Sequence, residues 1–393
     1  MTVRTGALAG RTVPFHAPSI GEAEIAAVVD VLRSGWLTTG PRAKEFERAF
    51  AAAVGAPHAV ALNSATAALH LALEAAGVGP GDEVVVPTMT FAATAEVVLY
   101  LGARPVLADC DEATLNLAPG EIDRLLTPRT RAVIPVHYAG RPCDMDDITA
   151  RSRAHGLTVI EDAAHCFPCT YRGRPIGAIS DFTCFSFYAT KTITTGEGGM
   201  VTTADEDAAT RMRLMSLHGI SGDAWKRYTS EGSWFYEVVA PGMKYNLTDI
   251  AAALGLVQLG RAEEFRRERT RIASRYSAAF ETLSEVRCPE PAGDGEHAWH
   301  LYPIRLRLDR LRIGRGPFTA ALKAANVGCS VHFIPLHVHP YYRDAHGYRS
   351  DQFPNASAAY EELVSLPIYP AMTDADVDYV VEAVRSVVAA HRR

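Results

Sequence analysis

Two periodicities of apolar and polar residues alternate along the first 250 residues. Apolar residues recur at helical spacing in several stretches, which predicts helices between Ser19 and Gly35 and over residues 65–76, 94–101 and 146–155. Short apolar runs between them predict buried strands over residues 59–62, 83–87, 105–109, 132–136, 158–162 and 200–203. Strands that alternate with helices form a mostly parallel sheet covered by helices on both faces. We therefore expect an α/β fold.

The first of these helices has recognisable ends. Ser19 and Glu22 have the spacing of a capping box, and Gly35 is suited to end the helix. The apolar residues of the helix share one face: Ile25, Val28, Val29 and Leu32.

The pattern changes near residue 250. Thr248 is placed to cap a long helix that would link two domains. Beyond it, residues 300–308 alternate like a strand, and residues 318–325 have the pattern of a helix. We expect a large domain over residues 1–250, followed by the linking helix and a smaller C-terminal α+β domain over residues 251–393.

Length and composition fit an enzyme better than a small binding module. The chain has 393 residues, of which 48% are hydrophobic and 21% charged, close to globular averages. Lys and Arg number 39 against 45 Asp and Glu, a net charge of −6. This charge lacks the positive excess of a general nucleic-acid binder. The seven cysteines are thinly spread, which favours reduced thiols over a disulfide framework.

No stretch has the character of a membrane span or a secretory leader. The first thirty residues lack a positive segment followed by an apolar one. Polar residues interrupt the most apolar stretch, residues 59–78. We expect a cytoplasmic protein with no membrane partner.

Polar residues directly after apolar strands are candidates for a ligand site, because open α/β sheets bind ligands beyond the carboxyl ends of their strands. Residues 63–67 bring small and hydroxyl side chains to a helix start, which suits either a phosphate cradle that includes Thr66 or an ordinary helix cap. Asp162 ends a predicted buried strand. A carboxylate there needs a cation or several hydrogen-bond donors, unless it caps a helix.

Lys191 stands in a segment of aromatic, hydroxyl and glycine residues, 182–199. Enclosure in such surroundings would lower the pKa of its amine and make it a nucleophile for a carbonyl group. The alternative is a solvated lysine on a loop. The glycines that follow allow another backbone to approach closely.

Three histidines, His332, His337 and His339, lie close together in an irregular segment that contains two prolines. No carboxylate lies among them, so binding of a polar substrate by His and Tyr side chains explains the segment better than zinc. We predict no metal site. Cys166 and Cys169 form a single pair, for which a redox role is an alternative to simple burial.

These candidates combine into one cofactor site. A nucleophilic lysine, a strand-end carboxylate 29 residues before it and a phosphate cradle are the parts that pyridoxal phosphate requires. Lys191 would bond to the aldehyde of the cofactor as a Schiff base, and Asp162 would keep the pyridine nitrogen protonated.

Further motifs extend this agreement over nearly the whole chain, at residues 34–40, 63–70, 81–87, 90–91, 137–140, 161–165, 186–191, 196–199 and 245–250. With them the chain resembles the pyridoxal-phosphate-dependent sugar aminotransferases of the DegT/StrS type. These enzymes have the aspartate aminotransferase fold, fold type I. As a set, the motifs are highly specific.

The resemblance implies a role for each matching residue. Lys191 would hold the cofactor and then move a proton, and Asp162 would pair with the pyridinium nitrogen. Phe91 would stack on the ring, and His165 would lie beside its 3-hydroxyl. The phosphate would be held by Ala65, Thr66, Ser186 and, across a homodimer with shared active sites, Asn246.

The resemblance also implies a reaction. Glutamate or glutamine would supply an amino group, which the cofactor would pass to a keto group, at C4, of a nucleotide-linked sugar in amino sugar biosynthesis. Substrate contacts are expected from the segment of clustered histidines and from an aromatic and basic stretch near residue 226. The residues concerned are His332, His337, His339, Tyr341, Lys226 and Arg227.

Several alternatives stay open at this point. The acceptor could be a 3-keto sugar nucleotide or a cyclitol ketone. Dehydratases of the family use the same cofactor but replace the lysine by histidine, so Lys191 favours transamination. A non-enzymatic sensor would be expected to carry an effector module, and none is visible in the sequence. Spacing does not encode which sugar, which carbon or which face is aminated.

Overall fold

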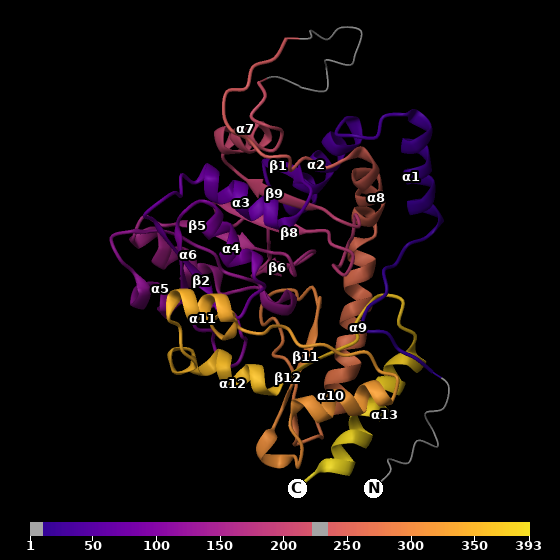
Figure 1. Cartoon of the computed structure of the whole chain (residues 1–393). Helices are drawn as coiled ribbons and strands as arrows, with labels where there is room; N and C mark the ends of the chain where they lie inside the picture. The colour runs from indigo at the N-terminus through magenta and orange to yellow at the C-terminus, as the bar shows by residue number, and fades with distance from the viewer. Residues whose placement is uncertain (1–10, 222–234) are drawn as a thin grey trace.

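A seven-stranded sheet forms the centre of the larger part of the molecule. The computed structural model describes residues 11–221 and 235–393. The strands lie side by side in the order β1 (His58–Leu62), β9 (Gly199–Thr203), β8 (Phe182–Ser186), β5 (Thr158–Asp162), β4 (Thr130–Val133), β2 (Glu83–Pro87) and β3 (Arg104–Ala108). Figure 1 shows this sheet in the upper half of the view.

The sheet is mostly parallel, as the sequence predicts. Strands β8, β5, β4, β2 and β3 pair in parallel, and β9 alone runs antiparallel to both of its neighbours, β8 and β1. The predicted strands at 83–87 and 158–162 match β2 and β5, whereas β4 begins and ends earlier than the predicted strand at 132–136.

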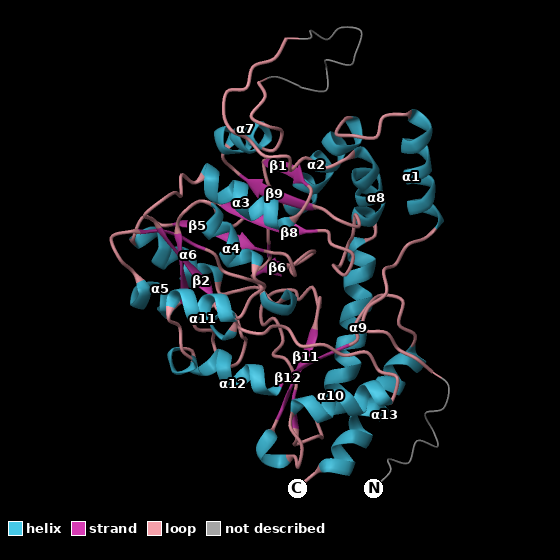
Figure 2. Ribbon diagram, in the orientation of Figure 1, coloured by secondary structure: helices cyan, strands magenta, loops and turns pink. Residues whose placement is uncertain are grey.

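Helices cover both faces of the sheet, which explains why its strands are apolar on both sides. Val84 and Val86 of β2 belong to one core cluster, and Val85 between them belongs to another, which also contains Ile148. Successive side chains of a strand point to opposite faces, so both faces are buried. The covering helices are α2 (Pro41–Val54), α3 (Ala65–Ala75), α4 (Ala93–Tyr100), α5 (Gly120–Leu125), α6 (Met145–Ala154) and α7 (Glu206–Met215) (Figure 2).

Helix α1 (Glu22–Ser34) corrects the predicted capping box. Gly21, not Ser19, is its N-cap, and the Gly21 N–H donates to the Glu24 carboxylate at 2.9 Å. Gly35 ends the helix at φ 75°, as expected. Much of the apolar face predicted from the sequence lies outside the core, because Glu24 turns inward to receive hydrogen bonds from Gln258 and Arg261. The exposed members of that face are Ile25 and Leu32.

The predicted long helix is two helices, α8 (Asp249–Gly260) and α9 (Ala262–Phe280). Thr248 caps α8 as predicted, accepting a hydrogen bond from the Ala251 N–H at 3.3 Å. The break falls at Arg261, whose N–H bonds to the carbonyl of Gln258, three residues back, instead of four. Helix α9 then runs from the sheet to the C-terminal part of the chain (Figure 1).

The C-terminal part has its own small sheet and core. Strands β10 (Val286–Arg287), β11 (Tyr302–Leu306) and β12 (Leu363–Leu366) are antiparallel. Its helices are α10 (Arg315–Ala324), α11 (Pro340–His346), α12 (Pro354–Glu362) and α13 (Asp374–His391). Strands β6 (Thr170–Tyr171) and β7 (Arg174–Pro175), between β5 and β8 in the sequence, form a separate short hairpin. Within residues 11–221 and 235–393, no helix is long and apolar enough to cross a bilayer.

Candidate active site

A cavity of about 370 Å³ opens beyond the carboxyl ends of β2, β5 and β8, where ligands bind in sheets of this kind. Its wall combines the loops after these strands, the start of α3 and a segment of the C-terminal part. The cavity brings together eight residues that the sequence singled out, Ala65, Thr66, Phe91, Asp162, His165, Ser186, Lys191 and His332.

Lys191 lies in the loop between β8 and β9, and its side chain reaches the cavity. Burial lowers the pKa of its amine from 10.5 to about 8, although the charge of Asp162 acts in the opposite direction. An amine with such a pKa is partly deprotonated near neutral pH, which is the form that attacks a carbonyl carbon. The solvated-loop alternative therefore does not describe this lysine.

Asp162 is the last residue of β5 and is 5% exposed. Burial raises the pKa of its carboxyl group, which hydrogen bonds and the charge of Lys191 oppose. The Thr94 hydroxyl donates to Oδ2 at 2.8 Å, and the Ala164 N–H donates to Oδ1 at 3.1 Å. The hydroxyls of Thr90 and Thr94 are 2.8 Å apart. This carboxylate is thus held in place by threonines of another loop and helix, and a cation in the cavity would offset its burial.

Helix α3 begins at the cavity, its first residues include an ordinary helix cap, and the phosphate cradle stays a prediction. Ser64 caps the helix by accepting a hydrogen bond from the Ala67 N–H at 3.0 Å, while Ala65 and Thr66 line the cavity. Gly199 of β9 passes so close that a Cβ there would lie 2.3 Å from the Ser64 carbonyl carbon. The N–H groups and dipole of a helix start bind anions.

Two phenylalanine and two histidine rings in contact with one another line the cavity. Phe91 is 63% exposed at the rim, and its ring centroid is 6.2 Å from that of Phe333. The His165 ring stacks on Phe333 at 5.6 Å and lies 4.4 Å from the His300 ring. A flat aromatic ring bound in this cavity would therefore meet aromatic and imidazole surfaces.

The clustered histidines divide into different environments. His332 lines the cavity, and its Nδ1 bonds to the Ser365 hydroxyl at 2.9 Å. His337 is buried with both ring nitrogens bonded, to the hydroxyls of Thr88 and Ser357 at 2.8 and 3.1 Å. The residues that line the cavity include neither His337 nor His339 nor Tyr341, which is exposed on α11.

One further predicted contact, Asn246, is not among the residues that line this cavity. Asn246 lies at the edge of β1, where its amide donates to the Thr39 hydroxyl at 2.6 Å, and it lines a different cavity. Lys226 and Arg227 lie outside the described residues.

Some residues of the site were not predicted from the sequence. Thr94, Glu197, His300 and Phe333 line the cavity. Thr94 sits inside a predicted helix, and His300 comes before a strand instead of after one, so neither has the strand-end signal. Phe333 directly follows His332, which the sequence singled out, and this position could have indicated that it lies at the site.

Cys166 and Cys169 lie buried beside Gly140. All seven cysteines are free, and the sulfurs of these two each lie 3.7 Å from the Gly140 carbonyl oxygen. Burial raises the pKa of the Cys166 thiol, which makes it less reactive. Among the described residues, no group of three His, Cys, Asp or Glu side chains could hold a metal ion.

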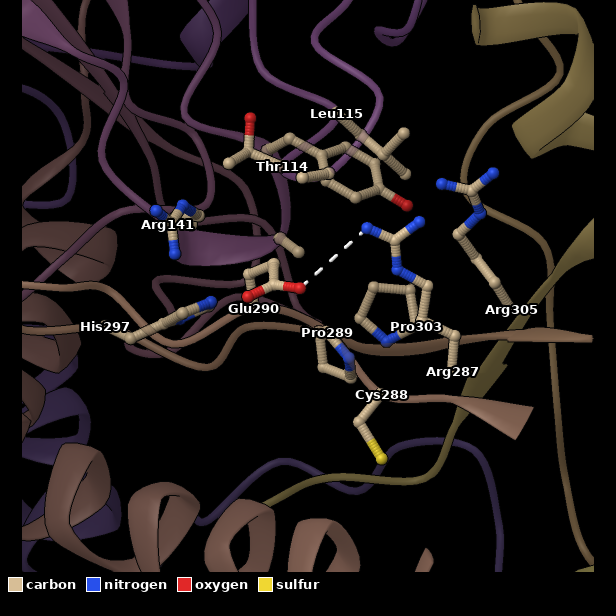
Figure 3. Close-up of a pocket in the computed structure, with 13 residues that line it drawn as sticks. Thr114, Leu115, Arg141, Arg287, Cys288, Pro289, Glu290, His297, Pro303 and Arg305 are labelled. Atoms are coloured by element: carbon tan, nitrogen blue, oxygen red, sulfur yellow. Dashed lines mark ion pairs between the residues drawn. The ribbon is translucent and has the colours of Figure 1, made fainter. Parts of the chain in front are cut away.

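A second, small cavity lies between the two parts of the chain, and Tyr138 is among the residues that line it. Figure 3 shows its lining, in which Arg287 pairs with Glu290 at 3.8 Å. Arg305, also in the lining, pairs with Glu362 at 2.8 Å. Its volume of about 20 Å³ is that of a water site. The buried Nη1 of Arg141, also in the lining, has no hydrogen-bond partner among the described residues. The small volume of this cavity, however, leaves no room for a substrate.

The residues of the main cavity fit pyridoxal phosphate. An enclosed amine, a buried carboxylate in need of a cation and a helix start suited to an anion share one cavity of about 370 Å³. The buried Nδ1 atom of His165, which has no partner in the described chain, is a further polar group beside it.

Comparison with known proteins agrees with this arrangement. Residues 18–385 match the model of the DegT/DnrJ/EryC1/StrS aminotransferase family. The spore coat polysaccharide biosynthesis protein SpsC of Bacillus subtilis is 52% identical over 377 residues, which cover 96% of this chain and 97% of that protein.

Solved structures give the same result. A "putative sugar aminotransferase", Spr1654 from Streptococcus pneumoniae in its PLP form, superposes with a TM-score of 0.90 at 36% identity, covering 97% of this chain and 99% of that one. DesV of S. venezuelae, in complex with a ketimine intermediate, superposes with a TM-score of 0.84 at 34% identity, covering 92% and 93%.

Proposed function

The chain belongs to the DegT/DnrJ/EryC1/StrS aminotransferase family, and we propose that it transfers an amino group from glutamate or glutamine to the C4 keto group of a nucleotide-linked sugar. It is a pyridoxal-phosphate-dependent sugar aminotransferase. The observation that carries the proposal is the enclosed Lys191 amine in one cavity with the Asp162 carboxylate. Similarity to a protein of polysaccharide biosynthesis supports an activated sugar as the acceptor.

When bound, pyridoxal phosphate supplies an aldehyde that carries the amino group and a ring that withdraws electrons from the reacting carbon. Asp162 would hold a proton on the pyridine nitrogen, with Thr94 and the Ala164 N–H fixing its two oxygens. The Nζ of Lys191 would bind the aldehyde and, once released, move a proton at the substrate carbon. Its lowered pKa suits both tasks, since it must give and take a proton near neutral pH.

The other expected cofactor residues would orient the ring and the phosphate. Ala65 and Thr66 at the start of α3, with Ser186 at the end of β8, would bind the phosphate. Phe91 would cover one face of the ring, and His165 would lie beside its 3-hydroxyl. These roles follow from the family resemblance and from the shared cavity.

Asn246 supports a homodimer with shared active sites. It is the expected phosphate ligand that does not line the cavity of its own chain, and we propose that it reaches the phosphate of the neighbouring subunit. His332 lies in the cavity and would contact the sugar. His337, His339 and Tyr341 stay predicted contacts for the substrate. Lys226 and Arg227 stay predicted contacts for the nucleotide part, and a cytoplasmic location stays a prediction.

An assay of amino transfer tests this function. The purified enzyme with pyridoxal phosphate and glutamate is given 4-keto and 3-keto sugar nucleotides and a cyclitol ketone, and the aminated product is detected by mass spectrometry. We expect product from a 4-keto sugar nucleotide and none with the Lys191→Ala variant. Turnover of the 3-keto compound or the cyclitol alone would contradict the C4 assignment, and release of water without amination would indicate a dehydratase.

A further inference from the structure

Two histidines from distant parts of the chain meet on the cavity wall. His165 follows β5 of the large sheet, and His300 comes just before β11 of the small sheet. Their ring centroids are 4.4 Å apart, with the ring planes tilted by 36°. Both side chains are buried and line the cavity. The proposed function gives a role to His165 but none to His300. The position of His300 against His165 therefore needs its own explanation.

Both rings have an unfilled hydrogen-bonding atom. The Nδ1 of His165 and the Nδ1 of His300 are sealed from solvent and have no partner in the described chain. A sealed N–H without an acceptor is rarer in proteins than a sealed acceptor. We therefore assign the proton of each ring to Nε2, the nitrogen that is not sealed. Each ring then presents one N–H donor.

The surroundings keep both rings neutral. Burial lowers the pKa of His165 and of His300 well below the usual range. The ammonium of Lys191 acts in the same direction on both rings. His332 acts on both rings, and Arg269 acts on His300. The carboxyl groups of Asp162 and Glu197 also line the cavity. A second neighbouring imidazole also disfavours a charge on either ring.

The segment that carries His300 is held firmly. Ala298 and Leu301 donate backbone hydrogen bonds to Gly140 and Ala139, at 2.9 and 3.2 Å. The buried guanidinium of Arg269 donates to the carbonyl of His300 at 3.3 Å. Trp299 between them has φ 46°, a conformation that a residue with a side chain keeps only where its neighbours enforce it. The position of the His300 ring is therefore set by both parts of the chain.

We propose that His300 is a positioning residue that packs against His165 and holds that ring in one orientation and one neutral tautomer toward the bound cofactor. The inference rests on the proposed function, in which His165 lies beside the 3-hydroxyl of pyridoxal phosphate. Without the His300 ring, His165 would gain room to turn and to take up a proton. A positively charged His165 would repel a second positive charge nearby. The nitrogen that joins the cofactor to Lys191 would then lose its proton at a lower pH.

The test is a pH titration of the visible absorption band of the holoenzyme, in wild type, His300→Ala, His300→Phe and His297→Ala. His297 controls for a general loosening of the segment. It is a buried histidine that stacks on Trp299 and accepts a hydrogen bond from the Trp299 N–H at 2.8 Å, but it does not line the main cavity. We expect the pH midpoint of the absorption change to fall by about 0.5 pH unit or more in His300→Ala. His300→Phe, which keeps a ring in place, and His297→Ala should stay close to wild type.

Each contrary result has a distinct meaning. An unchanged midpoint in His300→Ala, an equal shift in His297→Ala, or a shift in His300→Phe as large as that in His300→Ala would overturn the inference. Thermal melting of each variant shows whether it is folded, and His300→Phe retains the packing if His300→Ala does not fold. Absence of a visible band in the wild-type holoenzyme would count against the proposed function itself.

Discussion

At the scale of single residues, Lys191 and Asp162 set each other's protonation. Burial lowers the pKa of Lys191 to about 8, and the negative charge of Asp162 keeps it from falling further. In enzyme freed of cofactor, acylation of Lys191 should therefore rise with pH around a midpoint near 8. Asp162→Asn removes the opposing charge, so its midpoint should lie lower. The chain has five lysines, which peptide mass spectrometry resolves; a Lys191 midpoint near 10.5 would contradict this account.

Thr94 provides a second prediction at this scale. Its hydroxyl is a donor to the buried Asp162, and losing a hydrogen bond to a charged group costs about 1.5–3 kcal/mol. Thr94→Val removes the donor, which raises the pKa of Asp162 and weakens its hold on a pyridinium cation. We expect cofactor affinity to fall about 10- to 100-fold, measured by fluorescence titration of the enzyme freed of cofactor. Thr94→Ser keeps the hydroxyl and should bind nearly as wild type does; equal affinity in Thr94→Val would refute the role.

The sequence identifies those site residues that stand out against the residues next to them in the chain. Asp162 ends an apolar strand, and Lys191 stands alone among aromatic and glycine residues. Thr94 and His300 reach the same cavity only through tertiary packing of a helix and of a strained turn. No local pattern encodes such contacts, so the sequence could not have assigned them.

At the scale of elements, the strands were predictable and the helix ends less so. A strand buried on both faces is a short apolar run, and β2 and β5 begin and end at the predicted residues. The cap of α1 and the break at Arg261 are instead joined by one buried group, Glu24, whose carboxylate accepts hydrogen bonds from the Gly21 N–H and from the side chains of Gln258 and Arg261. The bonds from Gln258 and Arg261 join residues more than 230 positions apart, beyond the reach of local spacing.

The contact between β9 and the start of α3 gives a prediction about elements. A Cβ at Gly199 would lie 2.3 Å from the carbonyl carbon of Ser64, so Gly199→Ala must push β9 away from the helix start. We expect a loss of about 1–3 kcal/mol in the free energy of unfolding, typical of overpacking, and weaker binding of the cofactor. Gly120→Ala is the control, because nothing lies near its added methyl group. Equal stability of the two variants in denaturant titrations would be inconsistent with the predicted clash.

At the scale of the whole molecule, the proposed large domain (residues 1–250) and the linking helix with the small domain (residues 251–393) both contribute to the cavity wall, through Lys191 and through His300, for example. The proposed homodimer with shared sites would extend this to two chains. If Asn246 serves the neighbouring subunit, each site combines Lys191 of one subunit with Asn246 of the other. Lys191→Ala and Asn246→Ala therefore damage a site from different subunits. A heterodimer of the two then contains one intact site.

Subunit complementation tests that arrangement. Each variant alone should be strongly impaired, and unfolding and refolding a mixture of both should restore about a quarter of wild-type activity, since half of the dimers are mixed and each has one intact site of two. The same mixture without refolding, so that subunits do not exchange, is the control. No gain on refolding, or a monomeric mass by light scattering, would exclude sites shared between subunits.

The central claim is that Lys191 carries the cofactor. Borohydride reduction of the holoenzyme converts the carbon–nitrogen double bond to a stable linkage, and peptide mass spectrometry then locates it. We predict the phosphopyridoxyl group on Lys191 and on none of the other four lysines, Lys44, Lys226, Lys244 and Lys323. Its recovery on another lysine, or on none, would contradict the account.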